Sequence, residues 1–415
     1  MTIMNSLYIG VNGLTAHGDA ISIVGDNIAN TSTVGFKRER AQFSDMLGGV
    51  LGGQRMGGGV RLGAAQTMFE QGQLTSTGNP LDLAISGHGL FVVNGNHDGH
   101  NANFYTRNGQ FHLDDKGTVV NSEGLKLQGY TMDAAGVRGT KVGDLALGAT
   151  QSPALPTSNA ALTVNLQADT TTPALPFDPL NPNTTSNYAT SFTTYDSLGG
   201  AHQVQMYYRN NGANTWEVHA MVDGGEVGGT VGTPVEIATG NLNFNSTGTL
   251  ASSTVTPANV TFTNASAQTI ALTFTDSTQY AGQLSATNGT DIDGHAAGNL
   301  TDVTVNSDGT IQGIYDNGDK RTIAQVAIAS FQNEEGLTRD GNNLYMESQD
   351  SGQALIDNAG TGKRGSIASG SLESSNVDLG NELVTLIAYQ RAYEANSKTV
   401  TTADEMLSDV TNLKR

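Results

Sequence analysis

Apolar residues near the start of the chain recur at alternating steps of three and four. Within residues 4–30 the positions that follow this spacing are Met4, Leu7, Val11, Leu14, Ile21 and Ile28, with Gly18 and Gly25 at the intervening positions. Such steps place side chains on one face of an α-helix, and sustained over several turns they form a heptad stripe. The pattern therefore predicts a helix over residues 4–30 with one apolar face.

The end of the chain carries a longer pattern of the same kind. Residues 377–413 predict one helix of roughly 55 Å at about 1.5 Å per residue. Ser374, Ser375 and Asn376 can cap this helix, and Asp378 and Glu382 fall in its first turns, where negative charge is favourable.

The apolar residues of this second helix fall on two lines. The first line contains Leu379, Leu383, Leu386, Tyr393, Val400 and Leu407, and the second contains Val384, Ala388, Ala392, Ala395, Ala403, Met406, Val410 and Leu413. Pairing with residues 4–30 inside one molecule would cover only one side of the helix. The second line therefore favours burial against other molecules.

The middle of the chain alternates at a period of two, which is typical of strands. From Gly78 onward Leu81, Leu83 and Ile85 alternate, and Asn108-Gly109 is a hairpin-turn signal. Prolines cluster between residues 153 and 182, and proline removes a donor from the strand ladder, so this window indicates entry into another domain.

These patterns predict a multidomain fold with α-helical coiled-coil terminal segments and two mainly-β domains. The expected parts are a terminal helical domain (1–34 and 370–415), an extended connector (35–77), an inner β domain (78–148 and 303–369) and an inserted outer β barrel or sandwich (149–302). The connector is expected because the stretch from Gly48 to Gly63 is rich in glycine, which favours a flexible chain.

Charge narrows the range of partners. The chain of 415 residues carries a net charge of −19. Nucleic acids and anionic membrane surfaces both require clustered Lys and Arg, so we expect neither as a partner. Between residues 149 and 302 Arg209 is the sole Lys or Arg against eleven Asp and Glu, a net of −10, so this segment is expected to face water.

Other features of the composition exclude further classes. The chain has no Cys, so disulfides and thiolate metal sites are impossible. No window approaches 18 apolar residues, so no membrane insertion is expected. Polar residues interrupt the first apolar stretch, which is unlike a cleavable signal peptide, and export by a route that needs none is expected.

Candidate sites for chemistry are weak. His88, His97, Asp98 and His100 crowd one region, but without helical or hairpin geometry that would fix three metal ligands. The glycine-rich stretch 48–63 lacks the Gly-Lys-Ser/Thr ending of a phosphate-binding loop.

Two acidic segments are equally weak candidates. The segment 291–294 opens like a calcium loop, but Ala296 replaces the required glycine and Asp302 the final glutamate. Adjacent Glu334 and Glu335 diverge on either a strand or a helix, so they cannot serve one substrate as acid and base. We expect no enzymatic activity, no cofactor and no metal.

Two sequence motifs resemble a known family. The first comprises Asn27, Ile28, Ala29, Asn30, Gly35 and Phe36, and the second comprises Asn376, Val377, Asp378, Gln390, Arg391, Tyr393 and Asn396. They are similar to the terminal motifs of bacterial flagellar rod and hook proteins. Residues 194–199 and 215–218 resemble the outer domain of the hook members, which the shorter rod members lack.

The resemblance implies a homopolymeric tube whose terminal helices line a central channel. The residues expected to mediate self-assembly are Leu7, Val11, Leu14, Ile21, Ile28, Leu383, Leu386, Tyr393, Val400, Leu407 and Val410. It also implies type III export to an extracellular site, with the distal rod protein, the hook cap and the hook–filament junction protein as partners.

The leading hypothesis is therefore a structural subunit of the flagellar hook, a flexible joint that transmits torque from the motor to the filament. Two alternatives remain at this point. The first is a distal rod subunit, because the sequence of Gln390–Glu394 resembles rod proteins as closely as it resembles hook proteins. A secreted β-rich adhesin or carbohydrate-binding protein is the other, with Trp216 as a candidate for sugar stacking. The free subunit is expected to have disordered terminal helices.

Overall fold

The computed structural model describes residues 2–51, 54–133, 136–147 and 151–412. The chain divides into two compact units: a first unit of Met1–Ala149, Asp302–Gly313 and Arg321–Arg415, and a second unit of Thr150–Thr301 and Ile314–Lys320. The expected boundary between residues 148 and 149, and Leu413 of the expected apolar line, lie outside the described residues. The fold is mostly β and multidomain, with one long helix near each end of the chain.

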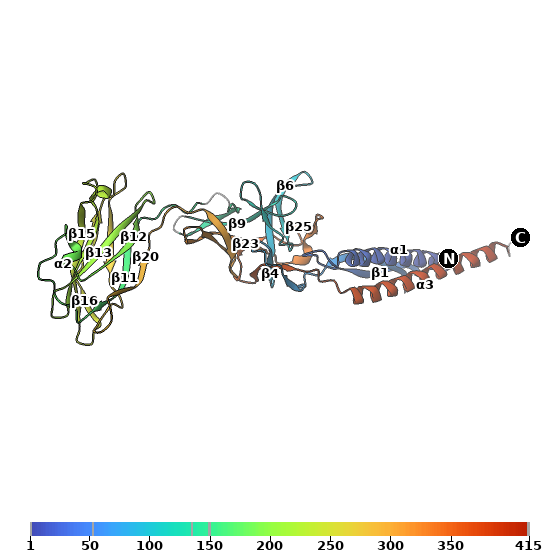
Figure 1. Cartoon of the computed structure of the whole chain (residues 1–415). Helices are drawn as coiled ribbons and strands as arrows, with labels where there is room; N and C mark the ends of the chain where they lie inside the picture. The colour runs from blue at the N-terminus through green and yellow to red at the C-terminus, as the bar shows by residue number, and fades with distance from the viewer. Residues whose placement is uncertain (1, 52–53, 134–135, 148–150, 413–415) are drawn as a thin grey trace. The chain divides into compact units, whose positions relative to one another are not determined.

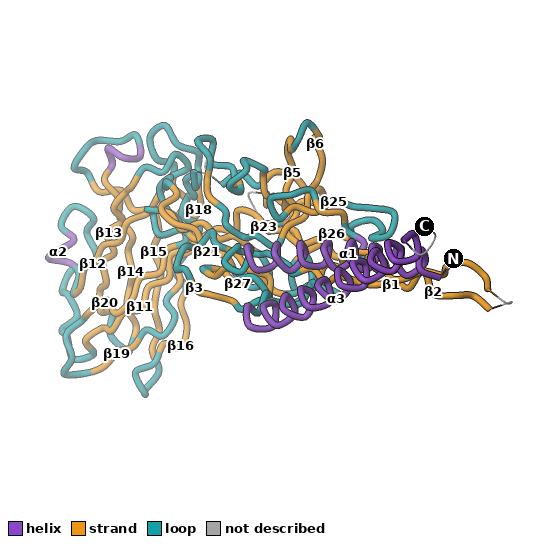
Figure 2. Tube along the Cα trace, turned by 90° about the vertical axis from the view of Figure 1, so that its right-hand side faces the viewer, coloured by secondary structure: helices purple, strands orange, loops and turns teal. Residues whose placement is uncertain are grey.

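Two antiparallel helices form one part of the first unit. Helices α1 (Thr2–Ala29) and α3 (Leu379–Asn412) lie side by side (Figures 1 and 2), and Gly10 of α1 lies against Val400 while Gly13 lies against Asn396. Asp378 caps α3, because its Oδ1 accepts hydrogen bonds from the amides of Gly380 (2.8 Å) and Asn381 (3.1 Å). Among the described residues, no helix combines the length and the apolar character needed to cross a membrane.

The face of α1 that is buried inside the molecule differs from the predicted stripe. The buried residues are small for the most part: Gly10, Gly13, Ala16, Ala20, Val24 and Asn27. In the predicted stripe, Met4 and Val11 are exposed and Leu7, Leu14, Ile21 and Ile28 are half-buried, while Gly25 has open space around it. Small side chains occupy this face because they let the two helix backbones approach closely. A Cβ on Gly13, for example, would lie 2.5 Å from Asn396 Oδ1.

The expected connector at 35–77 is instead largely a β-hairpin, so that prediction is wrong. Strands β1 (Glu39–Leu51) and β2 (Gln54–Thr67) pair antiparallel from Glu39 and Thr67 onward and pack on α1. One glycine serves close packing here: a Cβ on Gly59, whose φ is +99°, would lie 3.3 Å from the Cα of Ile9. Asn12 Nδ2 donates to the carbonyl of Gly58 at 3.0 Å and fixes this contact.

An antiparallel sheet forms the rest of the first unit. Its central strands follow the order β23 (Lys320–Ser330), β9 (Lys126–Met132), β5 (Leu90–His97), β6 (His100–Thr106), β25 (Leu344–Met346) and β24 (Thr338–Arg339). Further members are β7 (His112–Leu113), β8 (Val119–Val120), β10 (Arg138–Asp144), β21 (Leu300–Val305), β22 (Thr310–Tyr315) and β26 (Leu355–Asn358). We call this sheet the inner sheet.

Two short strand pairs, β3 (Leu74–Ser76) with β28 (Ser371–Glu373) and β4 (Leu83–Ser86) with β27 (Ser366–Ser369), join distant parts of the chain near the inner sheet. One buried core of the sheet combines Leu90, Val92, Tyr105, Ala329, Phe331, Leu337 and Tyr345. A short 3-10 turn, η2 (Glu334–Gly336), follows β23.

The second unit consists of two five-stranded sheets around a shared core. One sheet has the order β12 (Tyr188–Tyr195), β13 (Ala201–Asn210), β14 (Thr215–Asp223), β15 (Pro234–Phe244) and β16 (Leu250–Ser253). The other contains β17 (Ala258–Val260), β18 (Gln268–Thr273), β11 (Asn159–Gln167), β19 (Thr278–Tyr280) and β20 (Ala286–Ile292). The short helix α2 (Pro182–Thr185) and the turn η1 (Gly224–Val227) complete it.

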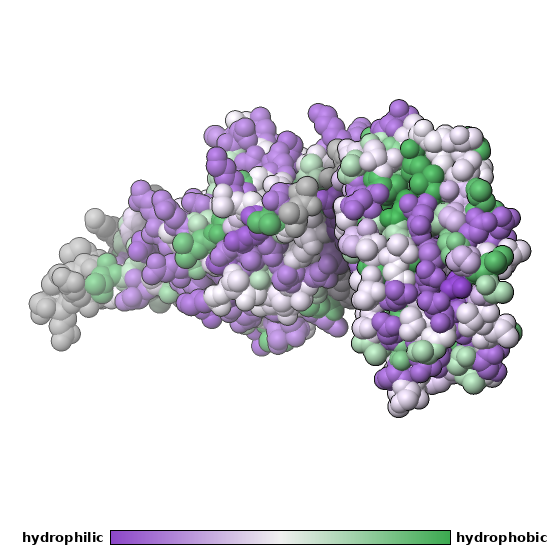
Figure 3. All heavy atoms as spheres, turned by 90° about the vertical axis from the view of Figure 1, so that its left-hand side faces the viewer, coloured by the Kyte–Doolittle hydropathy of each residue, from purple (hydrophilic) through white to green (hydrophobic). Residues whose placement is uncertain are grey.

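The core of the second unit settles the position of the single tryptophan. Trp216 is fully buried, and its Nε1 donates to Gln279 Oε1 at 2.9 Å. The expectation that Trp216 is available for sugar stacking is therefore wrong, since a strand residue on the inward face of a two-sheet core is covered by the opposite sheet. Figure 3 shows one face of this unit as a mixture of hydrophilic and hydrophobic residues.

Candidate assembly site

The terminal helices meet the inner sheet at a place where three chain segments cross, which we call the junction. Its segments are residues 30–38, 68–73 and 373–378, and backbone hydrogen bonds join them. The Gly35 amide donates to the carbonyl of Glu373 at 2.7 Å, and the Met68 amide donates to the carbonyl of Arg38 at 2.9 Å. The junction therefore holds the two ends of the chain together.

Two asparagine side chains organise the junction by donating and accepting at once. Buried Asn27 accepts from the Glu39 amide at 2.8 Å and donates to the Glu39 carbonyl at 2.8 Å and to Glu382 Oε2 at 3.3 Å. Asn376 Oδ1 accepts from the Arg38 amide at 2.7 Å, and its Nδ2 donates to the carbonyls of Met68 and Glu70. Only a carboxamide offers both roles in one planar group, which explains this residue type at both positions.

A buried charge cluster lies beneath these amides. Lys37 Nζ lies 2.7 Å from Glu373 Oε1, and Arg107 Nη1 lies 3.1 Å from Glu373 Oε2, with all three side chains almost fully buried. Burial lowers the pKa of Lys37, although the Glu373 carboxylate acts in the opposite direction. Removing one partner of such a cluster leaves an uncompensated buried charge, which typically costs about 3–5 kcal/mol.

Gly35 and Phe36 sit at the tightest point of the junction. Gly35 has φ of +71°, and a Cβ there would lie 2.5 Å from the Asn108 amide nitrogen. Phe36 is buried, and the Arg339 guanidinium lies 5.5 Å from the centre of its ring. The structure thus brings Asn27, Gly35, Phe36 and Asn376 of the two motifs together, although they lie more than 330 residues apart.

The other motif residues are spread along the helices. Ile28, Ala29 and Asn30 end α1, Val377 and Asp378 precede α3, and Gln390, Arg391, Tyr393 and Asn396 lie along α3. Gln390 and Arg391 are exposed, whereas Asn396 faces Gly13. Sequence reasoning missed Arg107, Glu373, Glu382 and Arg339, because single charged residues in unrelated segments give no local signal of the partner that they meet.

The paired helices still expose a broad apolar surface, which we call the outer helix faces. It consists of Tyr8 and Val11 on α1 and of Leu379, Leu383, Val384, Ile387, Tyr393, Met406 and Val410 on α3, each between 41% and 68% exposed. Of the remaining residues expected to mediate assembly, Leu386, Val400 and Leu407 are half-buried. Exposed apolar side chains that gather into large patches often mark a surface that binds another surface.

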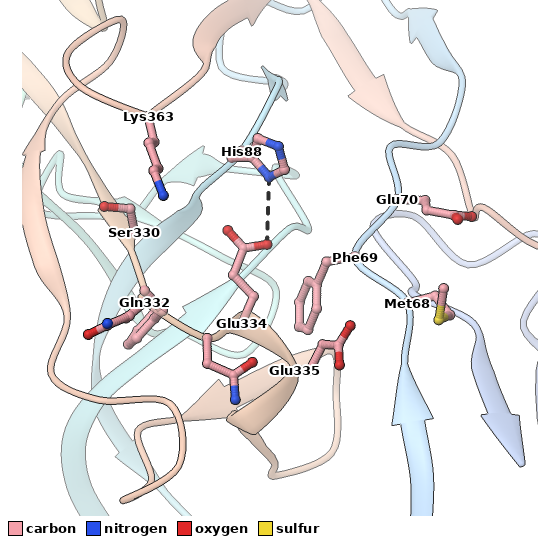
Figure 4. A pocket seen from close by; sticks show the side chains of 11 residues that line it. Met68, Phe69, Glu70, His88, Ser330, Gln332, Glu334, Glu335 and Lys363 are labelled. Carbon is pink, nitrogen blue, oxygen red and sulfur yellow. Dashed lines mark ion pairs between the residues drawn. The ribbon is translucent and has the colours of Figure 1, made fainter. Parts of the chain in front are cut away.

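The first unit also contains an open pocket of about 720 Å³ beside the junction. Its walls include Phe69, Phe331, Glu335 and Lys363, and Figure 4 shows Glu334 reaching toward His88, with 3.9 Å between Oε2 and Nδ1. Glu335 turns away to accept from Gln66 Nε2 at 2.6 Å. Glu334 and Glu335 therefore contact different partners and point in different directions.

Three of the candidate metal ligands lie on a hairpin, contrary to expectation, because His97 ends β5, His100 opposite it begins β6, and Asp98 lies in the turn between them. His88 pairs with Glu334, whereas the His97 ring packs edge-on against Phe104 and its Nε2 lies 3.3 Å from the carbonyl of Asp340. In the part of the chain that the structure describes, no group of three or more His, Asp or Glu side chains is arranged to hold a metal ion.

The class of protein follows from four matching family models, which all describe flagellar hook and basal body rod proteins. Residues 7–37 match the model of the flagella basal body rod protein, and residues 368–413 match the C-terminal region of the flagellar basal body rod FlgEFG proteins. Residues 84–171 match the flagellar hook protein FlgE/F/G D1 domain, and residues 165–295 match the flagellar basal body protein FlaE D2 domain.

Relatives over the whole length identify the branch of this class. The chain is 35% identical to the flagellar hook protein FlgE of Escherichia coli (strain K12), over 97% of this chain and 98% of that one. It is 36% identical to FlgE of Salmonella typhimurium over the same shares, and 33% identical to FlgE of Treponema pallidum over the full length of both. The chain belongs to the FlgE family of flagellar hook proteins.

A solved structure shows the same fold. The crystal structure of Helicobacter pylori flagellar hook protein FlgE2 aligns with a TM-score of 0.50 and 17% identity, covering 72% of this chain and all of that chain. The relatives reported above are hook proteins that match over the full length, and Trp216 is buried. Neither the rod alternative nor the carbohydrate-binding alternative is favoured.

Proposed function

We propose that this chain polymerises through its outer helix faces into the tube of the flagellar hook and that it acts purely as a structural element. The observation that carries the proposal is the apolar surface that remains on α1 and α3 after the two helices have paired. Full burial of a Leu, Ile or Met side chain contributes roughly 1.5–3 kcal/mol, so several such residues per subunit supply a strong drive to associate.

The rest of the subunit is suited to a load-bearing role. In this proposal the terminal helices form a coiled-coil inner layer around the channel, the inner sheet forms the wall, and the second unit faces the medium. The second unit is acidic and nearly free of basic residues, so neighbouring copies can slide without forming strong ion pairs. The polymer would then bend while the packed helices resist twist.

The proposed partners follow from the family resemblance. We propose export through the flagellar type III apparatus to an extracellular position between the distal rod protein and the hook–filament junction protein. The hook cap would stand at the growing end of the polymer. The exposed apolar helix faces support addition of the subunit to a polymer, because neighbouring copies would cover them.

Assembly of purified protein tests the proposal. Ile387→Asp places a charge on an apolar position of α3 that is 51% exposed in the subunit, so the monomer should fold normally while tubes fail to form. Ser397→Asp adds the same charge at an exposed polar position of α3 and should still assemble. Electron microscopy and sedimentation measure the outcome, and wild-type tubes from Ile387→Asp would contradict the proposal.

A further inference from the structure

We propose that Arg339 is a positioning residue that latches the terminal helices to the inner sheet and thereby sets the stiffness of the assembled tube. This inference rests on the proposed function for its mechanical consequence. The latch itself is a property of one subunit.

The geometry places one guanidinium against three separate elements. Arg339 ends β24 of the inner sheet, where it pairs with Tyr345 of β25. Its Nη1 lies 2.6 Å from Glu39 Oε1 at the start of β1 and 3.5 Å from Asp26 Oδ2 in the last turn of α1. The same group lies over the Phe36 ring.

The second contact of this region reinforces the latch. Asn343, which follows in the turn between β24 and β25, donates from Nδ2 to the carbonyl of Val34 at 3.0 Å. Both contacts come from one short hairpin of the inner sheet and hold the chain on either side of Phe36. The hairpin therefore grips the exit from α1 at two points.

No other ion pair among the described residues joins α1 or the β1–β2 hairpin to the inner sheet. The Lys37, Arg107 and Glu373 cluster is sealed from water, and it holds the crossing segments of the junction. Arg339, Asp26 and Glu39, in contrast, are 32%, 47% and 14% exposed. A partly hydrated pair can open and close at little cost, whereas the sealed cluster cannot.

The sealed cluster and the Arg339 latch therefore have different roles when the assembled tube is bent or twisted. The three chain segments of the junction and the sealed cluster keep the helices attached to the inner sheet. A chain segment alone, however, still permits rotation about its backbone bonds. The latch opposes that rotation because it spans from the sheet to the helix end. Arginine suits the position since its planar fork can bind two carboxylates and stack on a ring, which the point charge of lysine cannot do together.

The experiment compares three variants of the full chain. Arg339→Gln removes the latch, and Arg339→Lys keeps a charge beside Glu39 without the fork. Arg138→Gln is the matched control, because Arg138 also combines an ion pair, to Asp357 at 3.2 Å, with a ring, that of Tyr130 at 4.4 Å, but lies on β10 away from the junction.

Amide hydrogen exchange on the monomer reads the latch directly, since both terminal helices are formed in the structure of the single chain, contrary to the expectation that they are disordered in the free subunit. Arg339→Gln should raise exchange about five-fold at residues 24–29 and 34–40, the effect of losing an exposed ion pair. The exchange rate of Arg339→Lys at these residues should lie between those of Arg339→Gln and wild type, and Arg138→Gln should leave the exchange rate there unchanged. Equal exchange in wild type and Arg339→Gln, with both folded by circular dichroism, would overturn the latch.

Bending of assembled tubes, measured from electron micrographs, reads the mechanical consequence. Tubes of Arg339→Gln should bend more than wild-type tubes, and tubes of Arg138→Gln should match wild type. Identical bending in all three would overturn the inference while leaving the proposed function intact. If wild-type protein forms no tubes, the proposed function fails, and the exchange experiment still decides whether the latch exists.

Discussion

At the scale of single residues, the junction depends on groups whose hydrogen-bonding capacity is used completely. Asn27 has both its acceptor and its donor group engaged while it is sealed from water, so it tolerates no change of chemistry even where the shape is kept. A buried group that loses its partner costs about 1–3 kcal/mol, more than any exposed contact in this region contributes.

Asn27→Asp should destabilise the first unit by roughly 2–4 kcal/mol, because the new carboxylate would face the Glu39 carbonyl and the Glu382 carboxylate at a buried site. Thermal unfolding followed by circular dichroism measures the change. Asn381→Asp is the control, since it places the same group at an exposed position in the first turn of α3, where negative charge is tolerated. Equal melting of the two variants would argue against the amide network.

Asp196 predicts a pH dependence in the second unit. Burial would raise the pKa of Asp196, but hydrogen bonds from His202 and from the Gly200 and Leu198 amides outweigh it and hold the pKa below its ordinary value. A lowered folded pKa contributes stability that is present above the unfolded value near 3.8 and is lost as the pH falls through the folded value.

Asp196→Asn should therefore flatten the acid limb of the stability profile of the second unit between about pH 5 and pH 2. Chemical unfolding at a series of pH values, followed by the fluorescence of Trp216, measures it, because the single tryptophan lies in the core of this unit. Asp291→Asn, at an exposed position, should keep the wild-type profile. An unchanged profile in Asp196→Asn would exclude Asp196 as the source.

At the scale of elements, the helix α1 is shared between two partners. One side packs against α3 through small residues, and another side receives the β1–β2 hairpin, where Gly59 approaches the helix backbone. Because both contacts use positions without a large side chain, the backbones come close together. Of the larger apolar residues of α1, Met4, Tyr8 and Val11 remain exposed.

Gly59→Ala should loosen the hairpin from α1 by about 1–2 kcal/mol, because alanine is strained at φ of +99° and its methyl group would press on the Ile9 backbone. Amide exchange at residues 5–12 should rise. Gly57→Ala is the control, since a Cβ there meets open space on the same strand. The same exchange in both variants would show that the hairpin does not depend on the close approach at Gly59.

At the scale of the whole molecule, assembly and folding draw on different surfaces. Ala403 is the last buried residue of α3 among those whose side chains the structure describes; Leu407 beyond it is half-buried, and Met406 and Val410 are exposed. Most contacts inside one subunit thus lie before the last turns of the helix, whereas contacts between subunits are expected to use its whole length.

A chain that ends at Asp404 should therefore fold and melt like the full-length subunit but should not form tubes. Melting temperature and sedimentation measure the two properties separately. A truncated chain that assembles normally would place the essential contacts elsewhere on the outer helix faces, and one that fails to fold would show that this segment stabilises the subunit itself.

The sequence by itself determined the two terminal helices and the family. The three-to-four spacing produced the two terminal helices within two residues of their predicted starts and ends over the described chain, because helical periodicity depends only on neighbours in sequence. The terminal motifs and the outer-domain motifs at residues 194–199 and 215–218 indicated the family, because they too are short patterns of neighbouring residues.

The tertiary structure alone decided which surfaces meet. Asn27 and Glu382, or Lys37 and Glu373, are far apart in the chain, so no local pattern can pair them. Glycine in residues 48–63 favours flexibility in isolation, yet beside α1 it allows a close-packed strand. Smaller residues, and not the predicted heptad stripe, lie between the two helices inside the molecule. The distance between two helix backbones depends on the side chains of both helices, whereas a single sequence pattern describes only one of them.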